Sequence, residues 1–328
     1  METKKSPTTK GLLHKRCVLP GRLDGKTAIV TGASGGIGMY TTAELARRGA
    51  LVIMASRDMD KTREAKEKLM SLYSEKNAAW NQTDLADPSL KEHLKAIKDE
   101  QLVPEQLDLG SLESIRQFAK RISDAHPKVD YLINNAGITV ETYQKTKDGF
   151  EVDMGVNHLG HFLLTQLLLP VIKAAAPSRI IIVSAAGHLR GQLYKPDLLI
   201  SEEKFNWMDA YNSSKLANVM YATELSKRLE GTNVTVVSIH PGIVQTELMR
   251  HAKSWGNWLK VEMMKPFTVS PWDGAQTTLY TVLADNLIPG AYYSNCAQHA
   301  TNKLVESDEE RKWLWEKSCE LVGLNKDG

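Results

Sequence analysis

Short apolar runs, rich in β-branched residues, recur along the chain and are separated by segments with helical periodicity. Each run is continuously hydrophobic rather than alternating, which is typical of strands that are buried on both faces of a parallel sheet. The pattern therefore predicts an α/β fold, a doubly wound parallel sheet with helices on both faces. The five predicted strands are residues 27–31, 51–55, 130–134, 179–184 and 234–239.

The first two predicted strands enclose a helix and so complete a βαβ unit. The helix covers residues 38–48, with Arg47 and Arg48 in its last turn, and Gly49 ends it. Basic side chains are favourable at the C-terminal end of a helix dipole, and glycine is the usual residue just beyond that end. A βαβ unit at this position opens the Rossmann-type architecture, whose ligand binds beyond the carboxyl ends of the strands.

Segments outside this repeating pattern define the expected organisation. Residues 1–25 are polar and basic and predict a flexible N-terminal arm, whereas residues 26–328 predict a single domain. The polar stretch at about 74–100 exceeds what one βαβ unit needs and predicts a surface insertion, in which Asp87-Pro88 indicates a short helix. The segment at about 247–270 is rich in Trp and Met and predicts a substrate lid. The alternative is a helix that packs on the core or on a subunit partner.

The composition of the 328 residues narrows the compartment and the partner classes. The chain is 42% hydrophobic and 24% charged with a net charge of +2, so it can bury a sizeable core. Charges of both signs are scattered, which predicts no nucleic-acid partner. The three cysteines show neither a disulfide framework nor metal-ligand spacing, so we expect a reducing compartment, a cytoplasmic location and no metal site.

Apolar stretches of the sequence are too short or too interrupted to predict a transmembrane anchor. The N-terminal arm offers only Leu12-Leu13, and polar residues interrupt or flank residues 162–172, which predict a buried or subunit-interface helix. Peripheral membrane contact through the basic arm or the apolar lid is left open. A homodimer is left open as well.

A glycine-rich turn lies directly after the first strand and directly before its helix. Gly32, Gly36 and Gly38 let the backbone approach a pyrophosphate, and the helix N-terminus supplies free N–H groups and a partial positive charge. Ser34 and Ile37 belong to the same turn. The spacing differs from the usual GxGxxG, but its place in a βαβ unit predicts a dinucleotide cofactor.

This glycine spacing resembles that of the short-chain dehydrogenase/reductase family, and further motifs of the family follow in order. Segments such as VNHLGHFLLTQLLLP, YNSSKLANVM and HPGIVQTEL resemble the retinol dehydrogenase-like subgroup. The resemblance covers nearly the whole chain from Lys26 onward and implies a dinucleotide-binding catalytic domain. The motifs are Asn134-Asn135-Ala136-Gly137, Asn157, Ser184, Tyr211-Asn212-Ser213-Ser214-Lys215 and Pro241-Gly242.

The resemblance implies a catalytic set of four residues. Tyr211 would exchange a proton with the substrate oxygen, and Lys215, four positions on along a helix, shares its face. The lysine cation would lower the pKa of the tyrosine and would also hold the nicotinamide ribose. Ser184 would hydrogen-bond the carbonyl oxygen. Asn157 would support a water-linked proton path to the lysine, and a buried structural role is its alternative.

Cofactor preference depends on the residues at the end of the second strand. NAD-specific enzymes place an acid there for the ribose 2′-hydroxyl, whereas NADP needs a small polar group and a cation for its 2′-phosphate. Ser56 occupies the position of the acid and Arg57 follows it, which predicts NADP. A solvated strand-end charge is the alternative role for Arg57, and Asp58 is the residue that could contradict the preference.

The resemblance also assigns the remaining cofactor contacts. Asp108 and Leu109 match the family residues beside the adenine ring. Asp84 is the rival of Asp108, but it leaves too long an interval before Asn134 for one helix and one strand. The other expected cofactor contacts are Asn135, Ala136, Gly137, Tyr211, Lys215, Pro241, Gly242 and Thr246.

Together with Ser56 and Arg57, the resemblance implies an NADP-dependent oxidoreductase that interconverts a lipophilic alcohol and its aldehyde or ketone. A retinoid-like substrate is favoured by the subgroup resemblance. Two alternatives stay open: a steroid or xenobiotic carbonyl reductase, and an NADP-binding scaffold or sensor without turnover. The histidines at 158, 161, 188 and 240 lack metal-ligand spacing, so we expect structural or surface roles for them.

Overall fold

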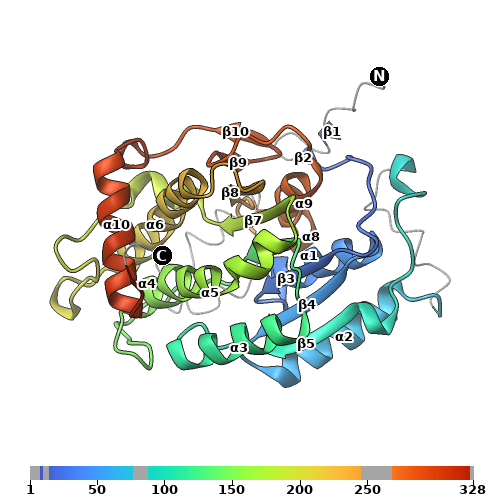
Figure 1. The fold of residues 1–328 in the computed structure, drawn as a ribbon, viewed down its shortest axis with the longest axis horizontal. Coiled ribbons are helices and arrows are strands. Elements are labelled where there is room, and N and C mark those ends of the chain that lie inside the picture. The colour runs from blue at the N-terminus through green and yellow to red at the C-terminus, as the bar shows by residue number, and fades with distance from the viewer. Residues whose placement is uncertain (1–7, 10–14, 77–87, 245–267, 326–328) are drawn as a thin grey trace.

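The computed structural model describes residues 8–9, 15–76, 88–244 and 268–325, and its centre is an eight-stranded sheet (Figure 1). Seven of the strands run parallel to their neighbours, and the last pairs antiparallel at one edge. The strands of this sheet are β3 (Thr27–Thr31), β4 (Leu51–Ser56), β5 (Leu102–Gln106), β6 (Tyr131–Asn134), β7 (Ser178–Val183), β8 (Val234–His240), β9 (Tyr292–Ser294) and β10 (Ala297–His299).

The order of strands across the sheet is β10-β9-β8-β7-β6-β3-β4-β5. The chain therefore runs outward from β3 to β5 and then returns to pair β6 with the other side of β3. This reversal is the topological switch point of a doubly wound sheet, where ligands bind beyond the carboxyl ends of the strands. The predicted fold class is confirmed.

Helices cover both faces of the sheet, because each parallel crossover needs a long connection (Figure 1). One apolar core lies between the sheet and α1 (Gly36–Arg47), α2 (Met59–Tyr73) and α9 (Gln276–Leu283). The second core lies on the other face. It is formed with α3 (Leu112–Ala125), α5 (His161–Ala174), α6 (Trp207–Arg228) and α10 (Asp308–Val322).

Short elements complete the described chain. The hairpin of β1 and β2 precedes the sheet, and α4 and η3 lead directly into α5. These elements are β1 (Thr8–Thr9), β2 (Lys15–Arg16), η1 (Pro88–Leu90), η2 (Asp99–Gln101), α4 (Val152–Met154), the π-helical turn η3 (Gly155–Gly160), η4 (Ala186–Arg190), η5 (Glu202–Lys204), α8 (Pro271–Gly274) and η8 (Lys303–Val305).

The prediction of a flexible arm over residues 1–25 is wrong for its C-terminal part. Cys17, Leu19 and Leu23 are buried in the core beside α1 and α9. Arg16 anchors the segment, since it pairs with Asp273 at 2.7 Å. This apolar stretch is too short to show a periodicity, but it covers an apolar face that the sheet helices leave open.

The described part of the predicted surface insertion, residues 74–100, packs against the rest of the domain. Leu90, Leu94 and Ile97 are buried. Backbone hydrogen bonds of 2.8 Å join Ile97 to Tyr73 and Lys95 to Arg47. The expected short helix is a single 3₁₀ turn that begins at Pro88, and residues 77–87 lie outside the described residues.

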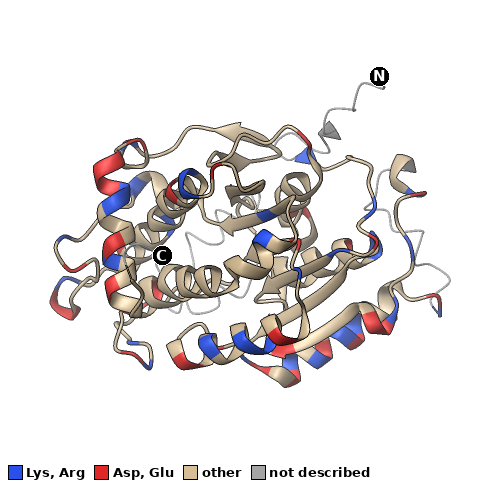
Figure 2. Ribbon diagram, in the orientation of Figure 1, with Lys and Arg blue, Asp and Glu red and all other residues tan. Residues whose placement is uncertain are grey.

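Charges of both signs are interspersed along α2, α3 and α10 (Figure 2). Among the described residues, one helical stretch, Val152–Ala174, is long and apolar enough to cross a membrane. However, 72% of its most apolar window is buried inside the protein. The stretch comprises α4, η3 and α5 and supplies part of the second core, so it lies in the protein as a core helix.

Candidate active site

The glycine turn lies at the carboxyl end of β3, beside the switch point of the sheet. Gly32 and Gly36 have φ angles of +69° and +52°, which favour glycine over residues with a side chain. A Cβ atom at Gly38 would collide with the carbonyl oxygen of Gly32, so the helix can only approach this closely without a side chain. The predicted glycines therefore form one tight turn into α1.

The N-terminus of α1 is open toward this turn. Its N-cap residue is Gly35, which has no side chain that could cap the helix. The first N–H groups of α1 are therefore available to a ligand. A helix N-terminus of this kind binds anionic phosphate groups. Ser34 and Ile37, the other predicted residues of the turn, lie on either side of the Gly35–Gly36 pair. The turn thus fits the pyrophosphate of a dinucleotide.

Behind the turn, β6 is tied to β3 by side chains. The backbone N–H groups of Asn135 and Ala136 both donate to the Thr31 hydroxyl at 2.9 Å, and the Asn135 amide donates to the Thr31 carbonyl at 2.8 Å. A Cβ at Gly32 would lie 3.0 Å from the Cα of Ala136. Asn135 and Ala136 therefore fix the shape of the glycine turn.

A buried histidine, which the sequence analysis did not assign to the site, completes this network. The Thr31 hydroxyl accepts two N–H bonds and lies 2.9 Å from His161 Nε2, closer than its other possible acceptor, the Ile133 carbonyl at 3.4 Å. The remaining ring nitrogen, Nδ1, then carries hydrogen and donates to the Asn157 carbonyl at 3.1 Å. Burial lowers the pKa of His161 to about 3, which keeps the ring neutral in this role.

The end of β4 places the predicted cofactor-selecting residues next to the glycine turn. The backbone N–H of Ser34 donates to the Ser56 hydroxyl at 3.1 Å. Arg57 is exposed directly after the strand. Asp58 is engaged elsewhere, because its carboxylate caps α2 and accepts the Lys61 N–H at 3.1 Å.

Asp108 and Leu109 follow β5 at the same edge of the sheet. The Asp108 carboxylate accepts the Gly110 N–H at 3.0 Å and pairs with Lys147 at 2.9 Å. Leu109 is buried and joins the second core. The rival residue, Asp84, lies outside the described residues.

Tyr211 and Lys215 lie one turn apart on α6, as predicted. The Lys215 ammonium lies 5.6 Å from the centre of the Tyr211 ring and contacts the Val183 carbonyl at 3.4 Å. Ser184 follows β7, is buried and donates its hydroxyl proton to the carbonyl of Lys215 at 2.7 Å. The three predicted residues thus meet at one place, and Ser184 must rotate its hydroxyl proton to serve another acceptor.

Asn157 lies in the π-helical turn η3 and is linked to this group through Ser214. Its amide donates to the Ser214 hydroxyl at 3.0 Å, and Ser214 donates to the Tyr211 carbonyl at 2.8 Å. Asn157 also exchanges two hydrogen bonds with the backbone of Ile138, of 2.8 and 2.9 Å. A side chain at Gly137 would have its Cβ only 3.2 Å from the Lys215 ammonium nitrogen, so glycine leaves space for the lysine.

The segment after β8 brings Pro241 and Gly242 to the same edge of the sheet. Gly242 has a φ of +91°, a conformation that favours glycine. Beyond it, the side chain of Val244 approaches Ile37 of the glycine turn across Gly274. Thr246 and most of the predicted lid lie outside the described residues.

Comparison with known proteins identifies this arrangement. Residues 26–93 and 88–257 match the family model of short-chain dehydrogenases. The chain belongs to the short-chain dehydrogenase/reductase family. Together with the relatives below, this makes it a retinol dehydrogenase-like oxidoreductase of the alcohol/carbonyl type, in a family that binds nicotinamide cofactors.

The curated relatives of this short-chain dehydrogenase/reductase are similar over almost their whole length. Retinol dehydrogenase 13 of Homo sapiens is 41% identical over 326 residues, 98% of this chain and 90% of that protein. Retinol dehydrogenase 14 of Mus musculus is 40% identical and covers 94% of this chain and 89% of that protein. The predicted family and subgroup are confirmed.

Solved structures agree with the fold. An uncharacterised protein from Mycobacterium paratuberculosis is 30% identical with a TM-score of 0.70, over 93% of this chain and 96% of that one. A short-chain dehydrogenase from Burkholderia cenocepacia J2315, solved in complex with NADP, has a TM-score of 0.62 at 22% identity over 84% of this chain and 97% of that one. At that identity the second likeness shows the fold alone.

The pKa values in this short-chain dehydrogenase/reductase are set mainly by burial. Burial lowers the pKa of Lys215 to about 8, and the negative charge of Asp153 opposes the shift. Burial raises the pKa of Tyr211, and Asp153 raises it further. Both causes of the Tyr211 shift raise its pKa, so the lowering by Lys215 that the sequence analysis expected is not seen in this structure.

Asp153 is the main residue of this site that the sequence analysis missed. It lies on α4 and is fully buried. Its carboxyl group acts electrostatically on both Tyr211 and Lys215. The sequence does hold a signal, because Asp153 precedes Asn157 by one helical turn and so shares its face.

Three of the histidines that were expected to be structural make such contacts in the structure. His158 and His161 are buried and hydrogen-bonded, and His188 contacts the Ala185 carbonyl at 2.8 Å. In the described part of the chain, we find no group of His, Cys, Asp and Glu that could hold a metal ion.

Proposed function

We propose that the protein is an NADP-dependent oxidoreductase that interconverts a lipophilic alcohol and its aldehyde or ketone, with a retinoid-like substrate. The observation that carries the proposal is the convergence of Ser184, Tyr211, Lys215 and Asn157 beside the glycine turn. These four residues come from three elements, and hydrogen bonds of 2.7–3.0 Å link them through Ser214 and the backbone of α6. If these residues only stabilised the fold, nothing would explain why a lysine is buried there, because burying a charged group is costly.

Proton transfer is the task of Tyr211 in the proposed mechanism. In reduction, its hydroxyl donates a proton to the carbonyl oxygen of the substrate, and in oxidation the phenolate takes that proton back. Ser184 donates a hydrogen bond to the same oxygen as negative charge develops on it. The bound nicotinamide supplies or accepts the hydride.

Lys215 serves this chemistry through its charge. With a pKa of about 8, the ammonium group is mostly protonated at neutral pH, so it can stabilise the Tyr211 phenolate and bind a ribose hydroxyl. Asn157 keeps the lysine in position through the segment that begins at Gly137. Its amide is fully engaged with Ile138 and Ser214, which supports the structural alternative as well as a proton path.

The proposed preference for NADP rests on the end of β4. An acid at Ser56 would repel the 2′-phosphate, and the acid that follows Arg57 in the sequence, Asp58, caps α2 instead. Arg57 is exposed directly beside the glycine turn and supplies the cation. Solved relatives with the same fold contain NADP, which agrees with this assignment.

Titration of both cofactors tests the preference. Arg57→Ala should weaken NADPH binding by about ten- to 150-fold and leave NADH binding nearly unchanged, because a charge-assisted hydrogen bond contributes about 1.5–3 kcal/mol. Ser56→Asp should shift the preference toward NADH. Fluorescence titration of the wild type and both variants measures these affinities, and equal affinity of the wild type for the two cofactors would reject the proposal.

The substrate class is tested by NADPH consumption with a panel of carbonyl compounds. The panel should contain retinal, other hydrophobic aldehydes, steroid ketones and small xenobiotic carbonyls. The names of the curated relatives favour retinal, and faster turnover of a steroid ketone or a small carbonyl would replace the retinoid assignment. NADPH binding without turnover across the panel would instead favour a scaffold or sensor.

A further inference from the structure

A buried carboxyl group lies in the catalytic centre without an assigned role. Asp153, on α4, is fully buried, and one turn later Asn157 lies on the same helical face. Both side chains contact the segment that follows β6. Asn157 bonds to the backbone of Ile138, and Asp153 accepts the Thr139 hydroxyl at 3.4 Å. Asn157 and Asp153 thus contact two consecutive residues of this segment, but of the two only Asp153 can carry a charge.

The hydrogen bonding of Asp153 is incomplete. Its Oδ1 atom is buried and has no hydrogen-bond partner in the part of the chain that the structure describes. The contact of Oδ2 with Thr139 is long for a bond to a carboxylate. A buried carboxylate with so few partners is costly, so the neutral acid is favoured over the anion.

Ionisable groups face Asp153 from two directions. Lys215 and Tyr211 act on it from α6, and Glu151, the buried N-cap of α4, acts on it from its own helix. Glu151 is committed to the cap, since its carboxylate accepts the N–H groups of Asp153 and Met154. Burial and Glu151 together raise the pKa of Asp153 to about 8, against the opposing effects of Lys215 and Thr139.

We propose that Asp153 is a positioning residue of the catalytic centre, which acts by its charge on Tyr211 and Lys215 and sets the pH range of each direction of the reaction. This inference rests on the proposed function, in which Tyr211 exchanges the proton. Asp153 and Tyr211 compete for one negative charge beside Lys215, so the two groups titrate as a coupled pair. Asp153 loses its proton first, and its anion then opposes the Tyr211 phenolate.

The two directions of the reaction respond oppositely to this charge. Alcohol oxidation needs the Tyr211 phenolate. An anionic Asp153 raises the pKa of Tyr211, so oxidation begins only at higher pH. Carbonyl reduction needs protonated Tyr211, so the same anion extends reduction to higher pH. Asp153 therefore favours reduction over a wider pH range than the tyrosine and lysine alone would give.

The first test is the pH profile of Asp153→Asn, which keeps the shape of the side chain and removes its charge. The rising limb of alcohol oxidation and the falling limb of carbonyl reduction should both move to lower pH, by about one pH unit for one charge in a partly dry site. NADPH affinity should stay within about twofold of the wild type, because a shift of about one unit in the pKa of Tyr211 leaves the residues that bind the cofactor phosphates unchanged. Unmoved limbs in a folded variant would overturn the proposal.

Thr139→Val is the matched second variant. It removes the hydroxyl that favours the Asp153 anion, so both limbs should move in the same direction as in Asp153→Asn but by a smaller amount. A shift to higher pH would contradict the proposal, and this variant decides the question if Asp153→Asn fails to fold. The exposed Asp124 at the end of α3 gives the control Asp124→Asn, whose profile should follow the wild type.

A second test needs no turnover and separates this inference from the proposed function. Protein labelled with ¹³C at the aspartate carboxyl carbon should show one signal that titrates far above the usual aspartate range and is absent from Asp153→Asn. In Lys215→Met this signal should titrate at still higher pH, because the opposing cation is gone. A signal in the ordinary range, or one that Lys215→Met leaves unchanged, would overturn the inference even if turnover is found. Absence of turnover in the wild type would reject the proposed function alone.

Discussion

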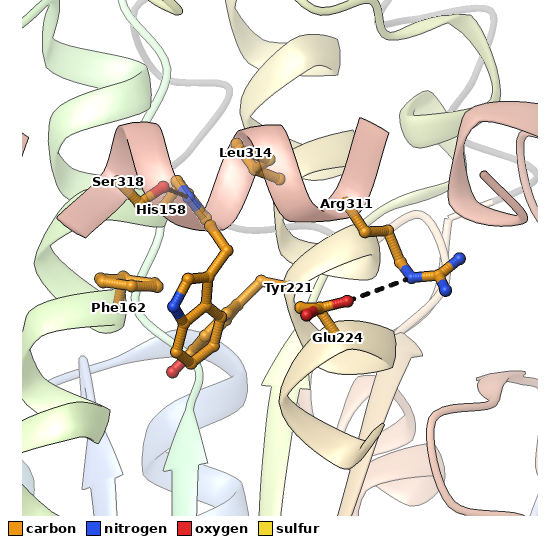
Figure 3. Close-up of a pocket in the computed structure, with 8 residues that line it drawn as sticks. His158, Phe162, Tyr221, Glu224, Arg311, Leu314 and Ser318 are labelled. Carbon is orange, nitrogen blue, oxygen red and sulfur yellow. Dashed lines mark hydrogen bonds and ion pairs between the residues drawn. The ribbon is translucent and has the colours of Figure 1, made fainter. Parts of the chain in front are cut away.

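Two clusters of buried and half-buried side chains lie between α6 and the helical stretch Val152–Ala174, and each holds residues that can titrate. The catalytic cluster consists of Asp153, Asn157, Tyr211 and Lys215. The aromatic cluster, on a different face, consists of His158, Phe162, Tyr221 and Trp315 and is closed by α10 (Figure 3). Adjacent residues, Asn157 and His158, thus point into two different environments.

The usual electrostatic indicators do not distinguish the clusters. Burial raises the pKa of Tyr221 as it does that of Tyr211, and it lowers the pKa of His158 to about 4. Each cluster also holds a buried polar atom without a hydrogen-bond partner among the described residues, Trp315 Nε1 in one and Asp153 Oδ1 in the other. Perturbed pKa values alone therefore do not identify an active site.

What separates the clusters is the space and the chemistry around them. Rings fill the aromatic cluster, with the Trp315 ring 5.2 Å from that of Phe162, and the Arg311–Glu224 pair closes its rim (Figure 3). In the catalytic cluster, by contrast, Tyr211 is only half-buried, and the absence of a side chain at Gly137 lets the Lys215 ammonium group lie close to the backbone. Tyr211 is thus more exposed than the buried Tyr221, and the predictions below test whether this difference in access decides which tyrosine acts.

The largest effect is expected for Tyr211→Phe, which removes the transferable proton and keeps the ring. Turnover should fall by about 10²–10⁴-fold, the usual contribution of general acid–base catalysis. NADPH affinity should be retained, because the glycine turn and the end of β4 are untouched. Steady-state NADPH consumption and fluorescence titration measure the two quantities. Turnover close to that of the wild type would remove the catalytic cluster from the mechanism.

Trp315→Ala should affect stability and not chemistry. The side chain is 2% exposed, and the Arg228 guanidinium lies 4.0 Å above its ring. Its loss should lower the free energy of unfolding by about 3–5 kcal/mol through the cavity that it leaves. Urea unfolding measures this, and kcat of the folded protein should be unchanged.

Trp313, on the same helix but only partly buried, provides the control for that variant. Trp313→Ala should cost much less stability, because solvent already reaches the side chain. If Trp315→Ala lowered kcat as strongly as Tyr211→Phe, the two clusters would be one functional unit and the comparison would fail.

The sequence predicted the central strands well and the edges poorly. Strands β3, β4, β6, β7 and β8 are buried on both faces, so they appear as continuous apolar runs. β5 lies at the edge of the sheet and contains Pro104 and Glu105, which fit an edge strand and conceal it in a search for apolar runs. The buried residues near Cys17 and Ile97 were missed for a related reason, since isolated apolar residues show no period.

The candidate site shows a similar division. Residues within family motifs, such as Ser184, Tyr211 and Lys215, were predicted and lie together in the structure. Asp153 lies outside any motif, and its importance arises from tertiary burial beside α6. His161 was expected to be structural, yet only the fold shows that it joins Thr31 to Asn157.

Acid should destabilise the protein partly through His158 of the aromatic cluster. The unfolded imidazole takes up a proton near pH 6.5, whereas the folded one does so only near pH 4. The unfolded state therefore binds more protons in this window, and stability that is complete above pH 6.5 falls by about 3 kcal/mol as the pH drops through 4. Urea unfolding between pH 7 and 4 measures this loss.

His158→Gln should flatten that pH dependence, because an amide cannot titrate but can still contact Ser318. His161, whose pKa is lowered to about 3, remains in both proteins and leaves a residual slope. Parallel stability curves for the two proteins would show that His158 is not protonated on unfolding in this range.

The smallest effect, and the direct counterpart of Tyr211→Phe, is expected for Tyr221→Phe on the same helix. The Tyr221 hydroxyl accepts a hydrogen bond from Gln166 at 2.9 Å, so its removal should lower the free energy of unfolding by about 1 kcal/mol. Turnover and its pH profile should not change. Addition of Gln166→Leu should recover part of the loss, because the half-buried amide is then no longer left without its partner. Two tyrosines with raised pKa values would then differ by orders of magnitude in their effect on turnover. A marked loss of turnover in Tyr221→Phe would instead show that burial and not access determines which tyrosine acts.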